Sequence, residues 1–424
     1  MGIKDILKPK DPDLTVDDLD LITKDPLLTG AASKEAPPAA PQVTAETKPP
    51  LSPPEERTPA ENALEPRRIE EDVILNALPA PPAPPRPSRK DSQGYFEGPV
   101  GLDIGTTNII VALREDKNFK ILRQLNAFVT IPSSNLTKDA LLKDDVMFFE
   151  GNQKIYIMGH AAEDFADIIG GTVRQPIEAG ILNPKENESE SVIKSFVERL
   201  FRPPKKRGEK VCFSIPGKPL EGNGSALVYH ESVIKNQLLG LGYTPIAINE
   251  GSAVVISELS GRNYTGIGIS IGGGMCNVSF SYLTVPVVSY SIPKGGDYID
   301  AMAARSIGES ILKIKRVKER QLNLSATPKD RIESALHIYY EDLFRTLAGS
   351  LQKVLGTTDN LPRLSKPIAI ALSGGTVMPA GSREMFQWAL KDVRLPFRIS
   401  EVIVAKYPLY ASAKGALIQA LLEE

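Results

Sequence analysis

The chain has 424 residues and carries 50 Lys and Arg against 52 Asp and Glu, so its net charge is −2. This balance excludes the basic footprint of a nucleic-acid-binding protein, and two cysteines with three histidines exclude a disulfide scaffold and a His/Cys metal cage. No run reaches the ~18 apolar residues of a membrane span, and the N-terminus shows neither a signal peptide nor a myristoylation site, so we expect a cytoplasmic protein.

The first 94 residues differ in composition from the rest. Of the 35 prolines, 18 lie between Pro9 and Pro87, and no aromatic residue occurs before Tyr95. Such a segment cannot bury enough apolar surface to offset its ordering entropy, which predicts a disordered tail over residues 1–94. The tail holds 12 basic and 17 acidic residues, against 38 and 35 in the remainder.

Two short parts of this tail, residues 11–25 and 69–78, alternate acidic and aliphatic residues. Each is either a segment that docks on a partner or simply solvated chain. The proline-rich residues 80–90 predict a polyproline II spacer between the tail and the body.

From residue 99 onward, strands and helices alternate, which predicts an α/β fold. Strands are expected at residues 100–104, 108–113, 128–131, 146–150, 154–158, 210–215, 246–248, 266–283 (two strands around a turn), 368–372 and 399–405. Helices are expected at residues 160–169, 189–200, 225–240, 252–259, 299–322, 329–355 and 410–422.

Three glycine-rich turns follow apolar strands. The first spans residues 101–108 and the second residues 268–277. A shift of 167 positions superposes them as Gly, apolar, polar, Ile, Gly and a small-residue turn, which predicts an internal repeat and two related lobes. The third turn contains Ser373, Gly374, Gly375 and Thr376. Each turn is either an ordinary tight hairpin or a cradle in which backbone N–H groups bind phosphate oxygens.

Two common phosphate-binding motifs are missing from the sequence. Gly217-Lys218 is followed by Pro219 rather than Ser or Thr, and the glycines between Gly266 and Gly272 have the wrong spacing for a dinucleotide fingerprint. A P-loop or a Rossmann site is therefore not expected.

These motifs resemble the actin superfamily of ATPases, which includes actin, MreB, MamK, DnaK-type chaperones, FtsA and PilM. The first turn resembles phosphate loop 1, the second resembles phosphate loop 2, and residues 373–381 resemble the adenosine motif. Residues 249–253 resemble a connecting motif, and residues 295–300 match the Gly-Gly-Asp-x-x-Asp that follows phosphate loop 2.

The resemblance implies a two-lobed actin-like (ribonuclease H-like) α/β ATPase fold with a nucleotide cleft. Lobe I would span residues 95–249, with a small MreB-like insert at about 126–180. Lobe II would span residues 250–424, and its last helix would pack back on lobe I. The first lobe is most similar to MreB and MamK, whereas the helical part between phosphate loop 2 and the adenosine motif is more similar to PilM and EutJ.

The resemblance also implies ATP or ADP with Mg²⁺ as ligands. Asp103 would stand beside the metal, holding it through water, and Glu250 would orient the attacking water. The nucleotide would contact residues of all three turns and two neighbours: Gly105, Thr106, Thr107, Asn108, Gly272, Gly273, Gly274, Met275, Gly295, Lys318, Gly374, Gly375 and Thr376.

Three positions depart from the family pattern. Relatives carry Asp at the position of Ser270, Thr at Met275 and Asp at Asn277. Losing a carboxylate and a hydroxyl weakens control of Mg²⁺ and water, so we expect nucleotide binding with slow or absent hydrolysis. The alternative is that Asp103 and Glu250 suffice.

Other reactive residues have ordinary explanations. The histidines His160, His230 and His337 lie on separate helices and are not expected to bind metal. Cys212 is expected in the core, and Cys276 lies in the second turn, where it could be accessible. The basic residues at 313–320, Lys318 among them, would form a solvated helix face or bind acidic partners or membrane phosphates.

Three functions are consistent with the resemblance. The first is a filament-forming cytoskeletal or scaffold protein that self-associates. The second is an ATP-binding assembly adaptor of the PilM or FtsA kind with a membrane partner. The third, a DnaK- or EutJ-like chaperone, is disfavoured because no substrate domain follows the adenosine motif. We expect the tail to bind a protein partner.

Overall fold

The computed structural model describes residues 95–115, 118–220, 224–359, 361–364 and 366–423. The tail predicted for residues 1–94 therefore lies outside the described residues. Within the part that is described, no helix is long and apolar enough to cross a membrane.

The first sheet has five strands in the order β10-β9-β1-β2-β3. These strands are β1 (Val100–Ile104), β2 (Asn108–Glu115), β3 (Asn118–Leu125), β9 (Lys210–Ile215) and β10 (Thr244–Asn249). β1, β2 and β3 are antiparallel, and β9 and β10 run parallel to β1. Helices α5 (Ser189–Leu200) and α6 (Ser225–Gly240) bury their aliphatic residues against this sheet.

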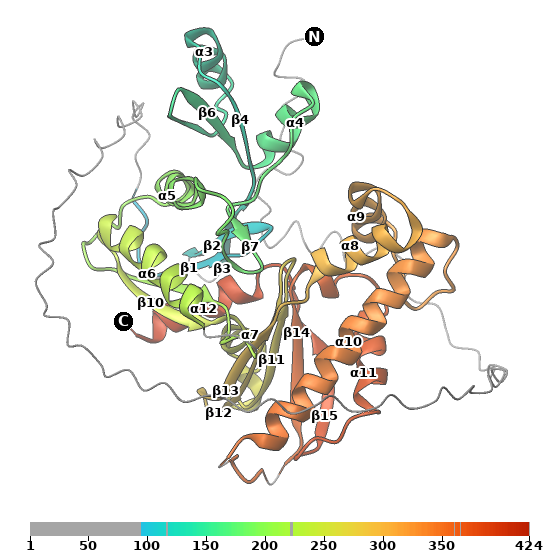
Figure 1. Cartoon of the computed structure of the whole chain (residues 1–424). Helices are drawn as coiled ribbons and strands as arrows, with labels where there is room; N and C mark the ends of the chain where they lie inside the picture. Colours follow the sequence, from blue (N-terminus) through green and yellow to red (C-terminus); the bar gives the residue numbers. More distant parts are fainter. Residues whose placement is uncertain (1–94, 116–117, 221–223, 360, 365, 424) are drawn as a thin grey trace, which may run out of the picture. The chain divides into compact units, whose positions relative to one another are not determined.

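The second sheet has the order β13-β12-β11-β14-β15. Its strands are β11 (Gly266–Ile271), β12 (Cys276–Tyr282), β13 (Val285–Ile292), β14 (Ile368–Ser373) and β15 (Ile399–Val404). Figure 1 shows α10 (Arg331–Thr357) and α11 (Ser382–Leu390) beside this sheet, and both contribute to its largest core cluster. The short helix η3 (Gly375–Val377) follows β14.

The two sheets repeat one topology. In each, an antiparallel strand triplet is extended by two parallel strands, so β1, β2, β3, β9 and β10 correspond to β11, β12, β13, β14 and β15. The turns are also closed alike: Gly105 N donates to Asn108 O over 2.9 Å, and Gly272 N donates to Met275 O over 3.0 Å. These residue pairs are related by the 167-residue shift, so the predicted internal repeat is confirmed.

A small sheet stands apart from these two in the order β4-β6-β5. It consists of β4 (Phe128–Pro132), β5 (Phe148–Gly151) and β6 (Lys154–Met158), and it packs with α3 (Asn135–Lys143) and α4 (His160–Ile169) around its own core cluster (Figure 1). The hairpin of β7 (Ile177–Glu178) and β8 (Ile181–Leu182) then leads back to α5. These elements occupy the stretch in which the sequence predicts an insert.

The structure corrects one predicted helix and adds strands that were not predicted. The helix expected over residues 299–322 is two helices, α8 (Gly296–Ile307) and α9 (Ile311–Arg320), because Gly308 ends α8 in a left-handed conformation and the Ser310 side chain caps α9. Strands β3 and β13 were not predicted. Each is the third strand of an antiparallel triplet. The glycine turn lies between the first two strands of the triplet, so it gives no signal for the third.

Two helices connect the sheets. α7 (Glu250–Glu258) directly follows β10 and packs on β11 and β12, whereas α12 (Ala411–Leu422) packs on β1 and β9. η2 (Ser260–Arg262) ends the α7 segment. We retain as a proposal the division into lobes at residues 95–249 and 250–424, which separates the two sheets between β10 and α7.

The contact between α7 and α12 depends on glycine. A Cβ atom added to Gly415 would lie 1.9 Å from the backbone oxygen of Ala253. On the facing helix, a Cβ added to Gly251 would lie 2.5 Å from Ser279 N of β12. Because these neighbours are backbone atoms, a larger residue at either position must move a helix or a strand.

We therefore predict that Gly415→Ala lowers the free energy of unfolding by roughly 1–3 kcal/mol, the usual cost of overpacking. Gly349→Ala is the matched control: Gly349 lies inside α10 with no atom within 4 Å of an added Cβ. It should be neutral or raise stability by up to about 1 kcal/mol. Denaturant unfolding measures both, and equal effects of the two substitutions would contradict the packing argument.

Candidate functional site

The first and second glycine turns face each other. A Cβ added to Gly273 would lie 2.6 Å from Thr107 Oγ1, and one added to Gly274 would lie 2.5 Å from Thr106 Oγ1. Thr106 is buried, and its Oγ1 accepts a hydrogen bond from Gly180 N over 3.1 Å. Two hydroxyls thus meet the glycine backbone of the other turn, with room for no other residue type at 273 or 274.

The third turn joins the second. Thr376 Oγ1 donates to Gly272 O over 2.9 Å, and Gly296 N donates to the same oxygen over 2.9 Å. Asp297 N, in the first turn of α8, donates to Gly273 O over 2.8 Å. Predicted site residues from all three turns, with Gly295 at the start of α8, therefore lie together. Gly374 and Gly375 stand where β14 leads into η3.

Lys318 lies at this junction but is already paired. Its Nζ donates to Asp300 Oδ2 over 2.6 Å and to Gly296 O over 3.0 Å, and the side chains are 9% and 1% exposed. The expectation that it belongs to a solvated basic face is therefore wrong. If α9 moved away from α8, one charge of this pair would be left buried without its partner, which is costly. The pair therefore holds α9 against α8. A contact of Lys318 with nucleotide stays a prediction.

Two carboxyl groups form the acidic part of the site. Asp103 stands at the end of β1 and accepts a hydrogen bond from Ser214 Oγ over 2.5 Å, and Glu250 begins α7. Burial raises the pKa of Asp103 to about 6. Burial and then the charge of Asp103 raise the pKa of Glu250 to about 8, against the opposing hydrogen bonds of Ser270 and Asn277. Glu250 therefore holds a proton at neutral pH in the absence of a cation.

The three departures from the family pattern occupy this region. Ser270 and Asn277 are paired residues of β11 and β12, both buried, and Asn277 Oδ1 accepts from Gly217 N over 2.8 Å. The side chain of Met275 reaches Gly180, where an added Cβ would lie 2.8 Å from its Sδ. A hydroxyl at 270, a thioether at 275 and an amide at 277 thus stand where the family pattern has a carboxylate, a hydroxyl and a carboxylate.

One site residue was missed by the sequence analysis. Asn126 is completely buried, its Nδ2 donates to Gly105 O over 2.8 Å, and its N donates to Thr107 O over 2.8 Å. Its Oδ1 is buried without a partner among the described residues. It holds the first turn from the end of β3, and because β3 was not predicted, no sequence signal pointed to it.

Two expectations about other residues can be judged. Cys276 is fully buried in β12 and burial raises its pKa, so the expected accessibility is wrong. Cys212 lies in the core as predicted. The described residues contain no group of three or more His, Cys, Asp and Glu that could hold a metal. His230 is buried, and its Nδ1 accepts from Leu182 N over 3.3 Å.

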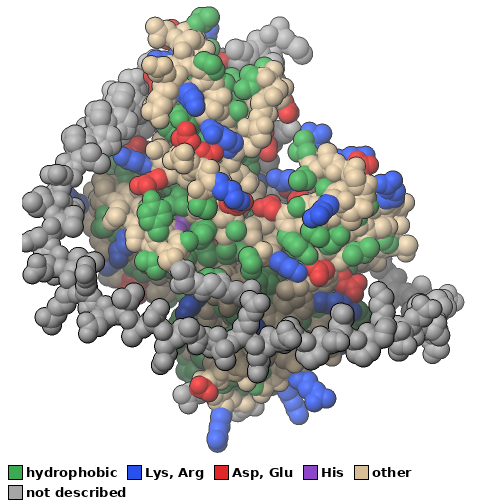
Figure 2. Space-filling view, in the orientation of Figure 1, with side chains coloured by type: hydrophobic (Ala, Val, Ile, Leu, Met, Phe, Trp, Pro, Cys, Tyr) green, Lys and Arg blue, Asp and Glu red, His purple; other side chains and the backbone are tan. Residues whose placement is uncertain are grey.

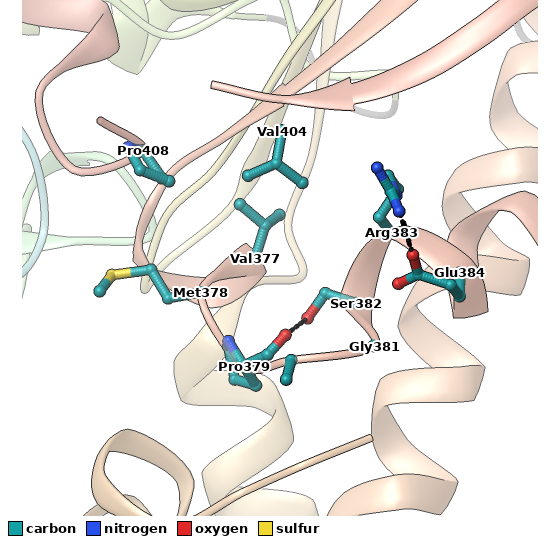
Figure 3. Close-up of a pocket in the computed structure, with 10 residues that line it drawn as sticks. Val377, Met378, Pro379, Gly381, Ser382, Arg383, Glu384, Val404 and Pro408 are labelled. Carbon is teal, nitrogen blue, oxygen red and sulfur yellow. Dashed lines mark hydrogen bonds and ion pairs between the residues drawn. The ribbon is translucent and has the colours of Figure 1, made fainter. Parts of the chain in front are cut away.

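A cavity of about 390 Å³ lies beside the third turn. Figure 3 shows that Val377, Met378 and Pro379 border it together with Val404 and Pro408, while the Ser382 hydroxyl is turned back to Pro379 O at 2.7 Å. Arg383 and Glu384 also line the cavity and form an ion pair with each other. The apolar part of the lining fits a flat aromatic ring better than a phosphate.

The residues fit a magnesium nucleotide in three respects. Two glycine turns and two threonine hydroxyls supply donors for phosphate oxygens, which is the arrangement of an anion cradle. Asp103 supplies an oxygen ligand of the kind that Mg²⁺ prefers. The unpartnered Asn126 Oδ1 leaves one acceptor unused beside the first turn.

Solved structures of other proteins share this fold. The MamK double helical filament matches with a TM-score of 0.58 and 17% identity over 77% of this chain and 99% of that chain. MreB5 of Spiroplasma citri bound to ADP matches with a TM-score of 0.53 and 16% identity over 76% and 95%. No curated protein matches in sequence. The fold is that of the actin-like ATPases, as the sequence predicts.

A sequence family defines a narrower group than this fold. The family model described as Volactin matches residues 99–420. The chain belongs to the Volactin family.

The two raised carboxyl pKa values predict how stability depends on pH. Glu250 binds its proton in the folded state up to about pH 8 but only up to about 4.5 when unfolded, so the folded state binds more protons between these values. Stability from this group is therefore greatest below pH 4.5 and is lost as the pH rises to 8. Asp103 acts in the same direction up to about pH 6.

Glu250→Gln should remove most of this loss. Without nucleotide and Mg²⁺, we expect the variant to unfold like the parent at pH 5 and to be more stable at pH 8 by at least about 1.4 kcal/mol, a tenfold change in the equilibrium constant. Denaturant unfolding across this range measures it, with the exposed Glu115→Gln as control. Parallel pH profiles for parent and variant would refute the assignment.

Proposed function

We propose that the chain is an ATP-binding, actin-like cytoskeletal or scaffold protein that self-associates into filaments and hydrolyses ATP weakly. One observation carries the proposal: the two repeated glycine turns meet through Thr106, Thr107, Gly273 and Gly274. A protein without a phosphate ligand has no need for two matched cradles aimed at each other.

The residues divide the work as follows. The first turn supplies Thr106 and Thr107 and the second turn supplies the backbone of residues 272–274 as donors to the phosphates. Because these hydroxyls contact Gly273 and Gly274, the two turns separate when the phosphates bind between them. The apolar side of the cavity beside η3 takes the adenine end. Asp103 holds Mg²⁺ through water, and the cation neutralises charge on the transferred phosphate.

Slow hydrolysis follows from the acidic part of the site. Glu250 begins α7, where it would orient the attacking water. Its pKa of about 8 leaves it protonated at neutral pH until the bound cation lowers that value. Ser270 supplies no negative charge and Met275 supplies no hydroxyl, so water is held by fewer groups than the family pattern provides.

One structural similarity supports self-association, and a second supports nucleotide binding. The chain shares its fold with the MamK double helical filament and with MreB5 bound to ADP. Transferred to this chain, they support a protein that binds a nucleotide and assembles. We further propose that it acts in the cytoplasm and contacts a membrane only through partners. The N-terminal tail would recruit a protein partner.

An adaptor of the PilM or FtsA kind is the second candidate. It is favoured by α8, α9 and α10, which follow one another without a strand in the described residues between β13 and β14. An adaptor would bind ATP and a partner peptide but would remain monomeric. A chaperone role is a weaker third reading.

Sedimentation and electron microscopy of the full chain distinguish these functions. We expect ATP, but not ADP, to shift the protein into the pellet as filaments. Gly273→Ala should abolish the ATP response, because its Cβ would lie 2.6 Å from Thr107 Oγ1, and Gly349→Ala should retain it. A protein that binds ATP and stays monomeric at high concentration would favour the adaptor.

The substitutions in the second turn predict a gain of hydrolysis. We expect slow phosphate release from the parent and at least about tenfold faster release from Ser270→Asp with Met275→Thr, the range that one positioned acid–base group contributes. Ser270→Asn with Met275→Thr is the uncharged control. Release from the parent at the rate of the restored variant would show that Asp103 and Glu250 suffice.

A further inference from the structure

A second pocket, far from the glycine turns, is lined by basic and apolar residues. It lies where α10 ends and where the parallel strands β14 and β15 begin, at the lower end of the second sheet (Figure 1). Its volume is about 530 Å³, and its lining comes from residues 361–364, 366–367 and 396–398. In Figure 2, Lys and Arg side chains project at this lower end.

The charges of this pocket all have one sign. Arg363, Lys366 and Arg398 line it, and no Asp or Glu stands among its lining residues. All three side chains are exposed, and none makes a hydrogen bond or an ion pair within the described part of the chain. Such a site attracts an anionic partner.

The remaining lining is apolar. Leu361, Leu364 and Phe397 are half-buried, and each packs on the core of the second sheet while it also lines the pocket. Three prolines complete the wall and restrict its backbone: Pro362, Pro367 and Pro396. A free phosphate would leave the apolar wall uncovered, so the lining fits a peptide that is both acidic and aliphatic.

The chain itself contains such a peptide. Residues 11–25 carry six Asp and one Lys, and they interleave Leu14, Val16, Leu19, Leu21 and Ile22 with these acids. We propose that this segment docks in the basic pocket of its own chain, with Asp carboxylates on Arg363, Lys366 and Arg398 and aliphatic side chains on the apolar wall.

Length and linkage favour the segment of the same chain. About 70 residues separate it from Tyr95, the first described residue, and a chain of that length spans up to about 230 Å. Covalent attachment gives an effective concentration in about the millimolar range, so weak ion pairs are sufficient. The docked segment then prevents other partners from binding at this end of the second sheet. This effect does not depend on nucleotide binding.

Carbodiimide cross-linking of the full chain tests the proposal, because this reagent joins a carboxylate to a lysine amine that touches it. Mass spectrometry should find links from Asp residues of segment 11–25 to Lys366. Their yield should be the same at low and high protein concentration. In a mixture of isotopically light and heavy protein, the linked pairs should not be mixed.

Arg363→Gln with Arg398→Gln leaves the acceptor Lys366 in place and should lower the yield about fivefold, the effect of two exposed ion pairs. Arg316→Gln with Arg320→Gln on α9 is the matched control and should change nothing. Thermal unfolding confirms that the variants fold.

Several outcomes would overturn the proposal. Links from residues 69–78 alone would assign the pocket to another segment, and isotopically mixed links would assign it to the tail of a second copy. Equal linking to Lys313 or Lys315 of α9, or an unchanged yield in the pocket variant, would mean nonspecific attraction of an acidic tail. Absence of tail links to Lys366 would leave the pocket without this occupant.

Discussion

The backbone contact of α7 with α12 is the constraint on which the rest of the structure depends. α7 carries Glu250 at its first position, and α12 lies on β1, the strand that carries Asp103 next to its last residue. Gly415 lets α12 approach the backbone of α7, and Gly251 lets α7 approach the backbone of β11 and β12. Because the two carboxyl groups come from elements held by this contact, their electrostatic coupling is a product of helix packing and not of any local motif.

The site itself is an arrangement of turns held by backbone groups. Gly272 O and Gly273 O receive hydrogen bonds from Gly296, Asp297 and Thr376, and the buried pair of Lys318 and Asp300 fixes α9 beside them. Most of the atoms that join the turns are backbone N–H and C=O groups and not side chains. Such a site is positioned before any ligand arrives, which reduces the ordering entropy that binding would otherwise cost.

The sequence predicted those parts of the fold that short-range patterns determine. The helices at 160–169, 189–200 and 225–240 agree with the structure to the residue, since their apolar faces are local, as are the glycines at the end of the first and third. β3 and β13 were missed because their pairing partners, not their own pattern, define them. The same reason hid Asn126, which follows β3, and it made the burial of Lys318 and Cys276 unpredictable from residue type.

The contacts of Gly180 have a mechanical consequence. In the loop between β7 and β8, Gly180 donates its N–H to Thr106 and lies against Met275, so this one residue touches both glycine turns. Two residues further on, Leu182 N donates to His230 on α6. If the distance between the turns changes, Gly180 must lose one contact or shift with one turn. The β7–β8 hairpin therefore responds to a change in the distance between the two turns. α6, which accepts a hydrogen bond from Leu182, is the first element to which this movement is transmitted.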